Sequence, residues 1–344
     1  MTVMSAATRP KGGGRITFMQ SLKGKLLLYF LLLSLIPMIA IGVLAFVQSQ
    51  TALQEDAQEQ LERMVQVQGQ VVEQWFTDRS RDMAVVAGAE RVAAMNPESV
   101  LSALKLYDRE WGIWETLLVT GPDGSTIATS DGSEADLSTR PYFQEAIKGN
   151  PAVSDALVSM VTGNVVVVFA SPVISNGEVV GVAAGTVPMD TLANLMASAQ
   201  VGETGEVYLV NGSSMVVTKL RFEEELKRQG RIKERSELEF RADTDAVRAA
   251  LAGNAGADEY VDYRDRQVVG AYAPVQAGAM RWAIVAKLDG DEAYAAATRL
   301  RNVTIVIVLV AAAVVAVLAF LIANSLARPM IEIASVAAAL SIGD

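Results

Sequence analysis

Two stretches of the chain, residues 26–47 and 303–323, are hydrophobic throughout and carry no charged residue. At about 1.5 Å of rise per residue, a helix over the first stretch is roughly 33 Å long and can cross the hydrocarbon core of a bilayer. A cleaved signal peptide is the alternative, but its apolar core covers only about 7–15 residues. In the second stretch apolar residues occupy every side of a helix, which favours a membrane span. The sequence therefore predicts two transmembrane helices.

Charges around the two spans predict how the chain crosses the membrane. Five basic residues and no acidic one precede the first span: Arg9, Lys11, Arg15, Lys23 and Lys25. Basic flanks stay in the cytoplasm, so we expect residues 1–25 to be a cytoplasmic tail. Residues 48–302 then form a periplasmic or extracellular domain, although Arg299 and Arg301 do not follow the rule. Residues 324–344 return to the cytoplasm, which makes a two-pass protein of the inner (plasma) membrane, in contact with its lipid.

After the first span the pattern changes to helical spacing. Apolar residues recur at steps of three, four or seven, which predicts one long helix that leaves the membrane. The positions are Leu53, Ala57, Leu61, Met64, Val71 and Trp75. This apolar stripe packs either on a sheet of the same chain or on a second copy of the helix. Asn96-Pro97 ends the helix, and a shorter helix restarts over residues 97–107.

Strand-like runs separated by turn residues fill most of the remaining external segment. A first strand–turn–strand group lies near residues 114–190 and a second near 206–288. The first group holds a helix over 141–148 and β-rich runs over 114–119, 125–129, 152–158, 165–174 and 179–187. A helix over 191–199 follows, and the second group has strands over 206–210, 214–218, 259–263, 267–273 and 282–287. A charged insert at 219–256 favours helix, as do residues 289–301. The fold class is therefore α+β.

Composition excludes several kinds of chemistry. The 344 residues include no Cys and no His, which rules out disulfides, Cys/His zinc sites, thiol catalysis and a Ser-His-Asp triad. Paired carboxylates or a Ser/Lys dyad would remain for an enzyme, but no motif for either is present. The net charge of −10, concentrated in the external segment, argues against a nucleic-acid surface. We expect neither an enzyme nor a bound metal or cofactor.

A series of short motifs in fixed order resembles a double Cache (dCache) sensor domain. The motifs are Arg140-Pro141-Tyr142-Phe143-Gln144-Glu145-Ala146, Val153-Ser154-Asp155, Thr162-Gly163, Gly177-x-Val179-Val180-Gly181-Val182 and Gly202-Glu203-Thr204-Gly205-x-x-Tyr208-Leu209-Val210. The resemblance covers about residues 50–300. It implies a long helix that carries two PAS-like antiparallel-sheet modules, flanked here by the two spans. We expect a distal module at about 107–199, which binds small ligands, and a proximal module at about 200–290.

The segment after the second span resembles the start of a HAMP domain. Leu326-Ala327-Arg328-Pro329 is followed by Met330, Ile333, Ala337 and Leu340, at steps typical of a two-stranded seam. This pattern predicts a homodimer, and the second HAMP helix is missing because the chain ends. The architecture is similar to the sensory half of methyl-accepting chemotaxis proteins. The alternatives are the sensory half of a histidine kinase or diguanylate cyclase, and an anchored ectodomain without a small-molecule ligand.

Candidate ligand-binding residues lie in and around the first motif. Arg140 can hold a carboxylate with a bidentate pair, and Asp155 can accept from an ammonium group. Four residues can supply aromatic walls, which also favour a cation: Tyr142, Phe143, Trp111 and Trp114. These groups suit a carboxylate or an amino acid as the small-molecule partner.

The resemblance also implies a gap in this site. Amino-acid-binding members of the family carry an Arg-x-Trp-aromatic run, a Tyr-x-Asp pair and a later aspartate. Here Tyr142, Val153 and Thr186 occupy three of those places, so the clamp for an amine is incomplete. Each candidate also has a structural alternative: Arg140 as a local partner, Asp155 as a strand-end residue, and the aromatic residues as core. Asp123-Gly124 and Asp131-Gly132 are predicted to be turns.

Overall fold

The computed structural model describes residues 22–196 and 201–340 and divides the chain into two units. Unit 1 comprises residues 1–53 with 295–344, and unit 2 comprises residues 54–294. Helix α1 (Leu22–Gly88) begins in unit 1 and ends in unit 2, and helix α9 (Ala295–Leu340) belongs to unit 1. The basic tail up to residue 21 lies outside the described residues.

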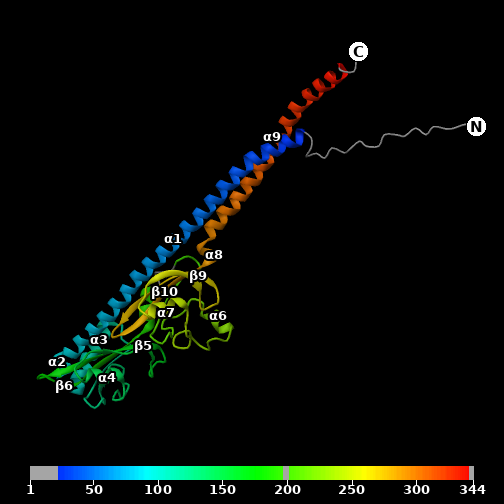
Figure 1. The fold of residues 1–344 in the computed structure, drawn as a ribbon. Coiled ribbons are helices and arrows are strands. Elements are labelled where there is room, and N and C mark those ends of the chain that lie inside the picture. Colours follow the sequence, from blue (N-terminus) through cyan, green and yellow to red (C-terminus); the bar gives the residue numbers. More distant parts are fainter. Residues whose placement is uncertain (1–21, 197–200, 341–344) are drawn as a thin grey trace, which may run out of the picture. The chain divides into compact units, whose positions relative to one another are not determined.

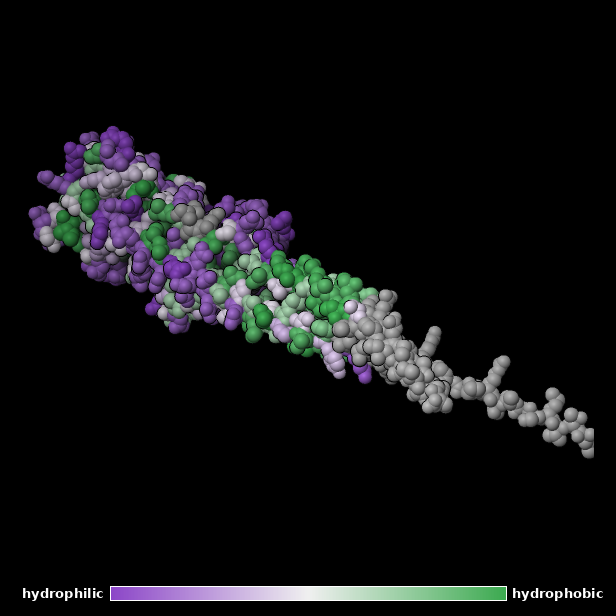
Figure 2. Space-filling model, turned by 90° about the horizontal axis from the view of Figure 1, so that it is seen from above, coloured by the Kyte–Doolittle hydropathy of each residue, from purple (hydrophilic) through white to green (hydrophobic). Residues whose placement is uncertain are grey.

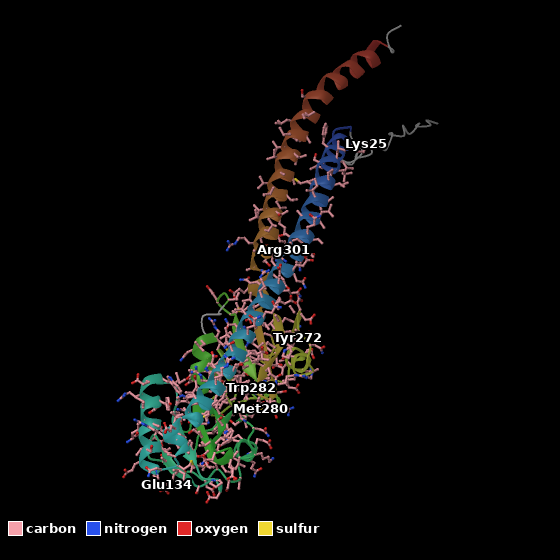
Figure 3. The ribbon with its side chains drawn as sticks, turned by 90° about the vertical axis from the view of Figure 1, so that its left-hand side faces the viewer. Lys25, Glu134, Tyr272, Met280, Trp282 and Arg301 are labelled. Atoms are coloured by element: carbon pink, nitrogen blue, oxygen red, sulfur yellow. The ribbon has the colours of Figure 1, made fainter. Side chains whose placement is uncertain are left out.

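Unit 1 is a pair of apolar helices, α1 and α9, which lie side by side and antiparallel (Figures 1 and 3). A Cβ on Gly42 of α1 would lie 3.1 Å from Thr304 Cγ2 of α9. Both helices are long and apolar enough to cross a membrane, within Leu28–Gly88 and Ala295–Ile322. Figure 2 shows hydrophobic side chains over the visible surface of this pair. The two predicted apolar helices are confirmed, and Pro37 does not interrupt the first.

The predicted HAMP start continues α9 without a break as far as Leu340. The side chains of Met330, Ile333, Ala337 and Leu340 lie outside those that the structure describes. The seam predicted from their spacing therefore stays a prediction.

In unit 2 the apolar stripe of α1 is buried beneath the sheets of the same chain. The buried positions include Leu61, Val65, Val72, Trp75, Phe76, Met83 and Val86. Of the two partners expected for the stripe, its own sheets are thus present, while Val67 and Val85 remain exposed on another side. The long helix ends at Gly88 rather than at Asn96-Pro97 as predicted, and the short α2 (Glu90–Ala93) follows it; the predicted restart at Pro97 is confirmed. Asn96 caps α3 (Pro97–Trp111) by accepting the Ser99 N–H at 3.1 Å.

The distal module is built on an antiparallel sheet of order β2-β1-β6-β5-β3, with β4 also paired to β5. Its elements are β1 (Thr116–Thr120), β2 (Thr126–Thr129), α4 (Pro141–Ala146), β3 (Ala152–Val153), β4 (Leu157–Val158), β5 (Val165–Ser175) and β6 (Glu178–Pro188). The single strand predicted over 152–158 is wrong, because it is split at Ser154 and Asp155. Ser154 Oγ accepts the Val168 N–H and Asp155 Oδ1 accepts the Ala156 N–H, so side chains replace ladder carbonyls there.

The proximal module has a sheet of order β7-β10-β9-β8. Its elements, with the preceding α5 (Met189–Met196), are β7 (Glu206–Val210), α6 (Glu223–Arg228), α7 (Asp245–Leu251), β8 (Gly256–Val261), β9 (Gln267–Ala277), β10 (Met280–Asp289) and α8 (Gly290–Ala293). The strand predicted over 214–218 is wrong. Asn211 Oδ1 accepts the N–H groups of Ser213 and Met215, so the chain turns there and forms isolated bridges only. The charged insert holds two short helices.

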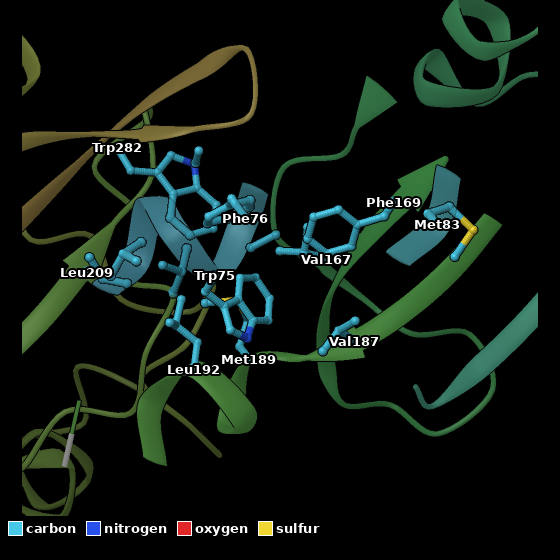
Figure 4. Close-up of a cluster of buried hydrophobic side chains, with 14 of the residues drawn as sticks. Trp75, Phe76, Met83, Val167, Phe169, Val187, Met189, Leu192, Leu209 and Trp282 are labelled. Carbon is cyan, nitrogen blue, oxygen red and sulfur yellow. The ribbon is translucent and has the colours of Figure 1, made fainter. Parts of the chain in front are cut away.

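An aromatic cluster joins α1 to both modules (Figure 4). Trp75 and Phe76 project from α1, and their ring centroids lie 5.0 Å apart. Phe169 of β5 lies 5.6 Å from Trp75, and Trp282 of β10 lies 5.2 Å from Phe76. Edge-on rings at such distances bury large areas in favourable geometry. One helix therefore provides the floor beneath both sheets.

The predicted turn at residues 202–205 is present and holds the carboxylate of Glu292 in α8. Glu292 Oε1 accepts the Glu203 N–H at 2.7 Å, and Oε2 accepts the Thr204 N–H at 2.8 Å. Gly202 has φ +61°, and a Cβ there would lie 2.2 Å from Glu292 Oε1. Glycine is therefore required at this position, and the turn that opens the proximal module is tied to the helix that closes it.

Candidate functional site

One side of the distal sheet, which we call the α4 face, carries most of the candidate residues. Strand pairing sets Thr116, Thr186 and Val168 side by side, and alternate residues of each strand share a face. Tyr142 and Phe143 of α4 are buried on this face, in a cluster that also holds Leu118, Val168 and Ala184. The opposite face packs on α1. The α4 face is thus where the sheet meets residues of the Arg140 motif.

Arg140 stands at the N-cap position of α4, where its side chain caps no N–H. The side chain is half-buried, and Nη2 lies 3.1 Å from the sulfur of Met160. Among the described residues no carboxylate pairs with Arg140. A guanidinium has five donors in a planar fork, and a thioether is only a weak acceptor. Arg140 therefore keeps most of its capacity for a carboxylate that arrives with a ligand.

Thr186 lies at the centre of a small polar group on the α4 face. Its Oγ1 accepts the Thr116 N–H at 3.1 Å, and Thr116 Oγ1 donates to Asp131 Oδ2 at 2.8 Å. Burial raises the pKa of Asp131, but donors from Ser133 and Thr116 outweigh it and hold the pKa below its ordinary value. Asp131 was predicted only as a turn residue. Its carboxylate belongs to this polar group, and no spacing in the sequence indicated that.

Glu115, which the sequence did not single out, lies directly before β1. Its Oε1 accepts from Ser159 Oγ at 2.8 Å and from Thr162 Oγ1. Ser159 and Thr162 belong to the turn of residues 159–163 between β4 and β5, and Met160 of this turn contacts Arg140. We call this turn the 159–163 loop. It brings Arg140 and Glu115 to the same part of the module.

Asp155 is placed differently from the expectation for an amine acceptor. Its Oδ1 accepts the Ala156 N–H at 2.8 Å, and its Oδ2 accepts from Asn211 Nδ2 at 3.0 Å. Asn211 follows β7 in the proximal module, so Asp155 links the two modules. Burial raises the pKa of Asp155 above its ordinary value. The structure does not bring Asp155 into the group around Thr186.

The aromatic candidates divide between site and core. Tyr142 and Phe143 are buried on the α4 face, where burial raises the pKa of Tyr142 and the charge of Arg140 opposes the shift. Tyr142 also lines a cavity of about 400 Å³ that reaches the β9–β10 turn. Trp114 packs edge-on against Phe169 on the α1 side, with centroids 6.1 Å apart. Trp111 ends α3 and stacks on Tyr107, with centroids 4.9 Å apart.

A wider groove of about 920 Å³ runs between α3 and β2 on the distal module. Its lining includes Glu98, Lys105, Asp131 and Glu134, and Figure 3 labels Glu134 at this end of unit 2. Asp131 therefore has one side toward the α4 face and one toward the surface. The groove is open and mostly acidic, which makes it a poor place for an anion.

Beside its apolar core, the proximal module buries a network of its own charged groups. Lys287 is fully buried and pairs with Asp262 at 2.5 Å and with Glu206 at 3.1 Å. Arg264 Nε lies 2.7 Å from Asp262, and Arg264 Nη2 also pairs with Asp289. Burial raises the pKa of Asp262, but Lys287 and Arg264 bring it below its ordinary value. Each of these charges has a partner, whereas Arg140 of the distal module has no carboxylate partner among the described residues.

Two comparisons of the sequence, with protein families and with individual known proteins, find a Cache domain and methyl-accepting chemotaxis proteins, respectively. A family model described as a Cache domain matches residues 49–297. The methyl-accepting chemotaxis protein McpA of Pseudomonas putida is 30% identical over 199 residues, which cover 57% of this chain. The same alignment covers 29% of McpA, so the chain corresponds to a minor part of that relative.

Solved structures share the fold. The ligand-binding domain of the Pseudomonas aeruginosa amino acid chemoreceptor PctB, in complex with L-Arg, has a TM-score of 0.55 and 19% identity. The alignment covers 70% of this chain and 98% of the PctB domain. The ligand-binding domain of the Campylobacter jejuni chemoreceptor Tlp3, in complex with L-valine, has a TM-score of 0.53 and 17% identity. The alignment covers 71% of this chain and 97% of the Tlp3 domain. The likeness shows the same α+β architecture with a long helix and two sheets.

The raised pKa of Asp155 predicts a specific pH dependence. The folded chain binds a proton at Asp155 more tightly than the unfolded chain does, so the stability that Asp155 contributes falls as pH rises through its folded pKa. Asp155→Asn removes this dependence. We expect its thermal midpoint, relative to the parent, to increase from about pH 4 to about pH 6, as measured by tryptophan fluorescence.

Asp123→Asn provides the matched control. The hydroxyl of Ser125 lowers the pKa of Asp123, so the parent gains stability there as pH rises. The midpoint of this variant, relative to the parent, should therefore decrease as pH rises toward about 4, and change little from about pH 4 to about pH 6. Equal trends for the two variants would contradict the assignment of Asp155 to a buried link.

Proposed function

Because the chain belongs to the Cache domain family, we propose that it is the sensory part of a membrane receptor for a small carboxylate-bearing molecule. The distal module binds the molecule, an amino acid or a related acid. The observation that carries the proposal is the half-buried Arg140, which has no carboxylate partner among the described residues and lies beside the 159–163 loop. The L-Arg and L-valine bound by PctB and Tlp3 each contain a carboxylate, which supports this ligand class.

The charge of the whole domain makes a single cation selective. The chain has 39 acidic and 29 basic residues, and the groove beside the site is acidic as well. Such a surface repels anions in general, so an anion binds only where a specific guanidinium compensates. A half-buried Arg140 provides a bidentate, charge-assisted pair in a medium less polar than water. Selectivity then comes from one residue rather than from a basic patch.

Signalling follows from differential binding. A ligand shifts an equilibrium between two arrangements only by the difference between its affinities for them. In the proximal module Glu292 ties the turn at 202–205 to α8, and α9 follows α8 directly in the chain. A change in the proximal module therefore reaches the start of α9, and through it the segment that resembles a HAMP domain. The output is chemotaxis, because McpA is a methyl-accepting chemotaxis protein.

The first prediction concerns Arg140. Loss of a charged hydrogen-bond partner in such a site costs about 1.5–3 kcal/mol, so Arg140→Ala should weaken ligand binding by about tenfold or more. The measurement is a thermal-shift screen of the chain in nanodiscs with organic acids and amino acids, followed by calorimetry. Arg109→Ala is the control, since Arg109 is exposed and, among the described residues, pairs only with its neighbour Glu110. A best ligand without a carboxylate, or unchanged binding by Arg140→Ala, would show that the assignment is wrong.

The second prediction concerns membrane topology. The chain contains no cysteine, so a single introduced cysteine is a unique probe. We place one in turn at Arg15, at the exposed Glu134 and at Asp344. An impermeant thiol reagent should label intact cells only through Glu134→Cys, because residues 48–302 are extracytoplasmic in the proposed topology. After the cells are permeabilised all three variants should react. Labelling of Asp344→Cys in intact cells would refute the two-pass arrangement.

The third prediction concerns a parallel homodimer. The exposed Val67 and Val85 are 18 residues apart, or about five helical turns, and therefore share one side of α1. A dimer through this side brings the two copies of Val67 together, so Val67→Cys should form a disulfide-linked dimer under mild oxidation. Leu61→Cys is the control, because Leu61 is 1% exposed beneath its own sheet. Absence of a crosslink at both Val67 and Val85 would argue against this interface.

A further inference from the structure

Glu115 is held at the edge of the candidate site by its backbone. Its N–H donates to the carbonyl of Thr186 at 2.8 Å, immediately before the register pair of Thr116 and Thr186. Trp114 on one side of it is core, and Thr116 on the other belongs to the polar group of the α4 face. The carboxylate of Glu115 therefore starts from a rigid position at the end of β1, next to Thr186.

The two oxygens of Glu115 are in different situations. Oε1 accepts from the hydroxyls of Ser159 and Thr162 in the 159–163 loop. Oε2 is sealed from solvent, and within the described part of the chain it has no hydrogen-bond donor. The described Lys and Arg side chains form no ion pair with Glu115 either. A buried carboxylate oxygen without a donor is unfavourable, and such an exception in a native structure calls for a missing partner.

The carboxylates of Asp131 and Asp155, the other acidic groups near the site, have no oxygen without a hydrogen-bond donor. Both oxygens of Asp131 accept hydrogen bonds, from Ser133 and from Thr116. Both oxygens of Asp155 are also engaged, one of them by the proximal module. Of the three carboxylates, Glu115 alone combines a negative charge with an unused acceptor. An ammonium group supplies three donors and the opposite charge, and so fits Oε2 better than a neutral donor does.

We infer that Glu115 accepts the ammonium group of the ligand and makes the site selective for amino acids over acids that lack an amine. The inference rests on the proposed function, in which Arg140 holds the carboxylate. Arg140 and Glu115 contact the same 159–163 loop, through Met160 and through Ser159 with Thr162. A cation and an anion that contact the same short loop offer one group for each charge of a zwitterion.

The 159–163 loop also gives this contact a route to the proximal module. Arg235 of the proximal module donates to the carbonyl of Gly163 at 2.7 Å. Oε2 of Glu115 is buried, so an amine reaches it only after a local rearrangement, and in our inference the 159–163 loop, whose hydroxyls hold Oε1, makes that rearrangement. Movement of the loop changes the distance between Arg235 and Gly163. An amine at Glu115 is therefore coupled to a contact between the modules.

The test compares matched ligands on the full chain in nanodiscs. The probes are the L-amino acids, the carboxylic acid that lacks the amine of the best one, and the amine that lacks its carboxylate. Glu115→Gln keeps the shape and the acceptor for Ser159 and Thr162 but removes the charge. We expect calorimetry to show binding of the amino acid at least about tenfold weaker, and binding of the amine-free acid within about twofold of the parent. Glu110→Gln, the control, should leave both affinities unchanged, since Glu110 is exposed and pairs with its neighbour Arg109.

The outcomes separate the inference from the proposed function. Parent-like binding of the amino acid by Glu115→Gln would overturn the inference, and so would an equal loss for both ligands, which indicates a structural role. If Glu115→Gln does not fold, Glu115→Asp is measured instead, since the shorter side chain withdraws Oε2. Its preference for the amino acid over the amine-free acid should fall at least about threefold, and an unchanged preference would overturn the inference. A parent that binds no acid and no amino acid defeats the proposed function itself.

Discussion

The structure of unit 2 depends on one constraint: a single face of α1 must be covered by two separate sheets. Trp75 and Phe76 meet this constraint by contacting Phe169 of the distal sheet and Trp282 of the proximal sheet. Buried aromatic side chains are the largest contributors to a core of this kind. The two modules share this floor, so neither can change its packing on α1 without affecting rings that the other also contacts.

The same constraint separates core from chemistry in the distal module. Residues that face α1 are apolar and close-packed, and a Cβ on Gly185 would come within 2.6 Å of Met83 and Trp114. The α4 face does not pack on α1. At the end of the sheet near Glu115 this face holds Thr116 and Thr186. Polar groups can be placed at this end of the face because apolar area is buried farther along it, around Leu118 and Ala184, and on the face that packs on α1. The candidate ligand groups therefore lie on the side of the sheet away from α1.

The two modules are joined by polar contacts in addition to the aromatic floor. Asp155 accepts from Asn211, and Arg235 donates to Gly163, and both contacts start from segments next to β4. Directional bonds of this kind are lost over small displacements, whereas apolar packing tolerates sliding. They are therefore suited to report a change in the distal module. In the proximal module, Lys287 forms a buried ion network with Glu206 and Asp262.

The sequence by itself determined the elements whose signal is local. Two long stretches without charged residues predicted the two apolar helices, and Asn96-Pro97 predicted the break before α3. Strand-like runs separated by turn residues predicted most strands of both sheets. Arg140 was found because its neighbours form a recognisable run. The split of the strand at Ser154 and the roles of Glu115 and Asp155 depended on tertiary structure. Glu115 meets Ser159 across 44 positions and Asp155 meets Asn211 across 56, and no local pattern encodes contacts between residues so distant along the chain.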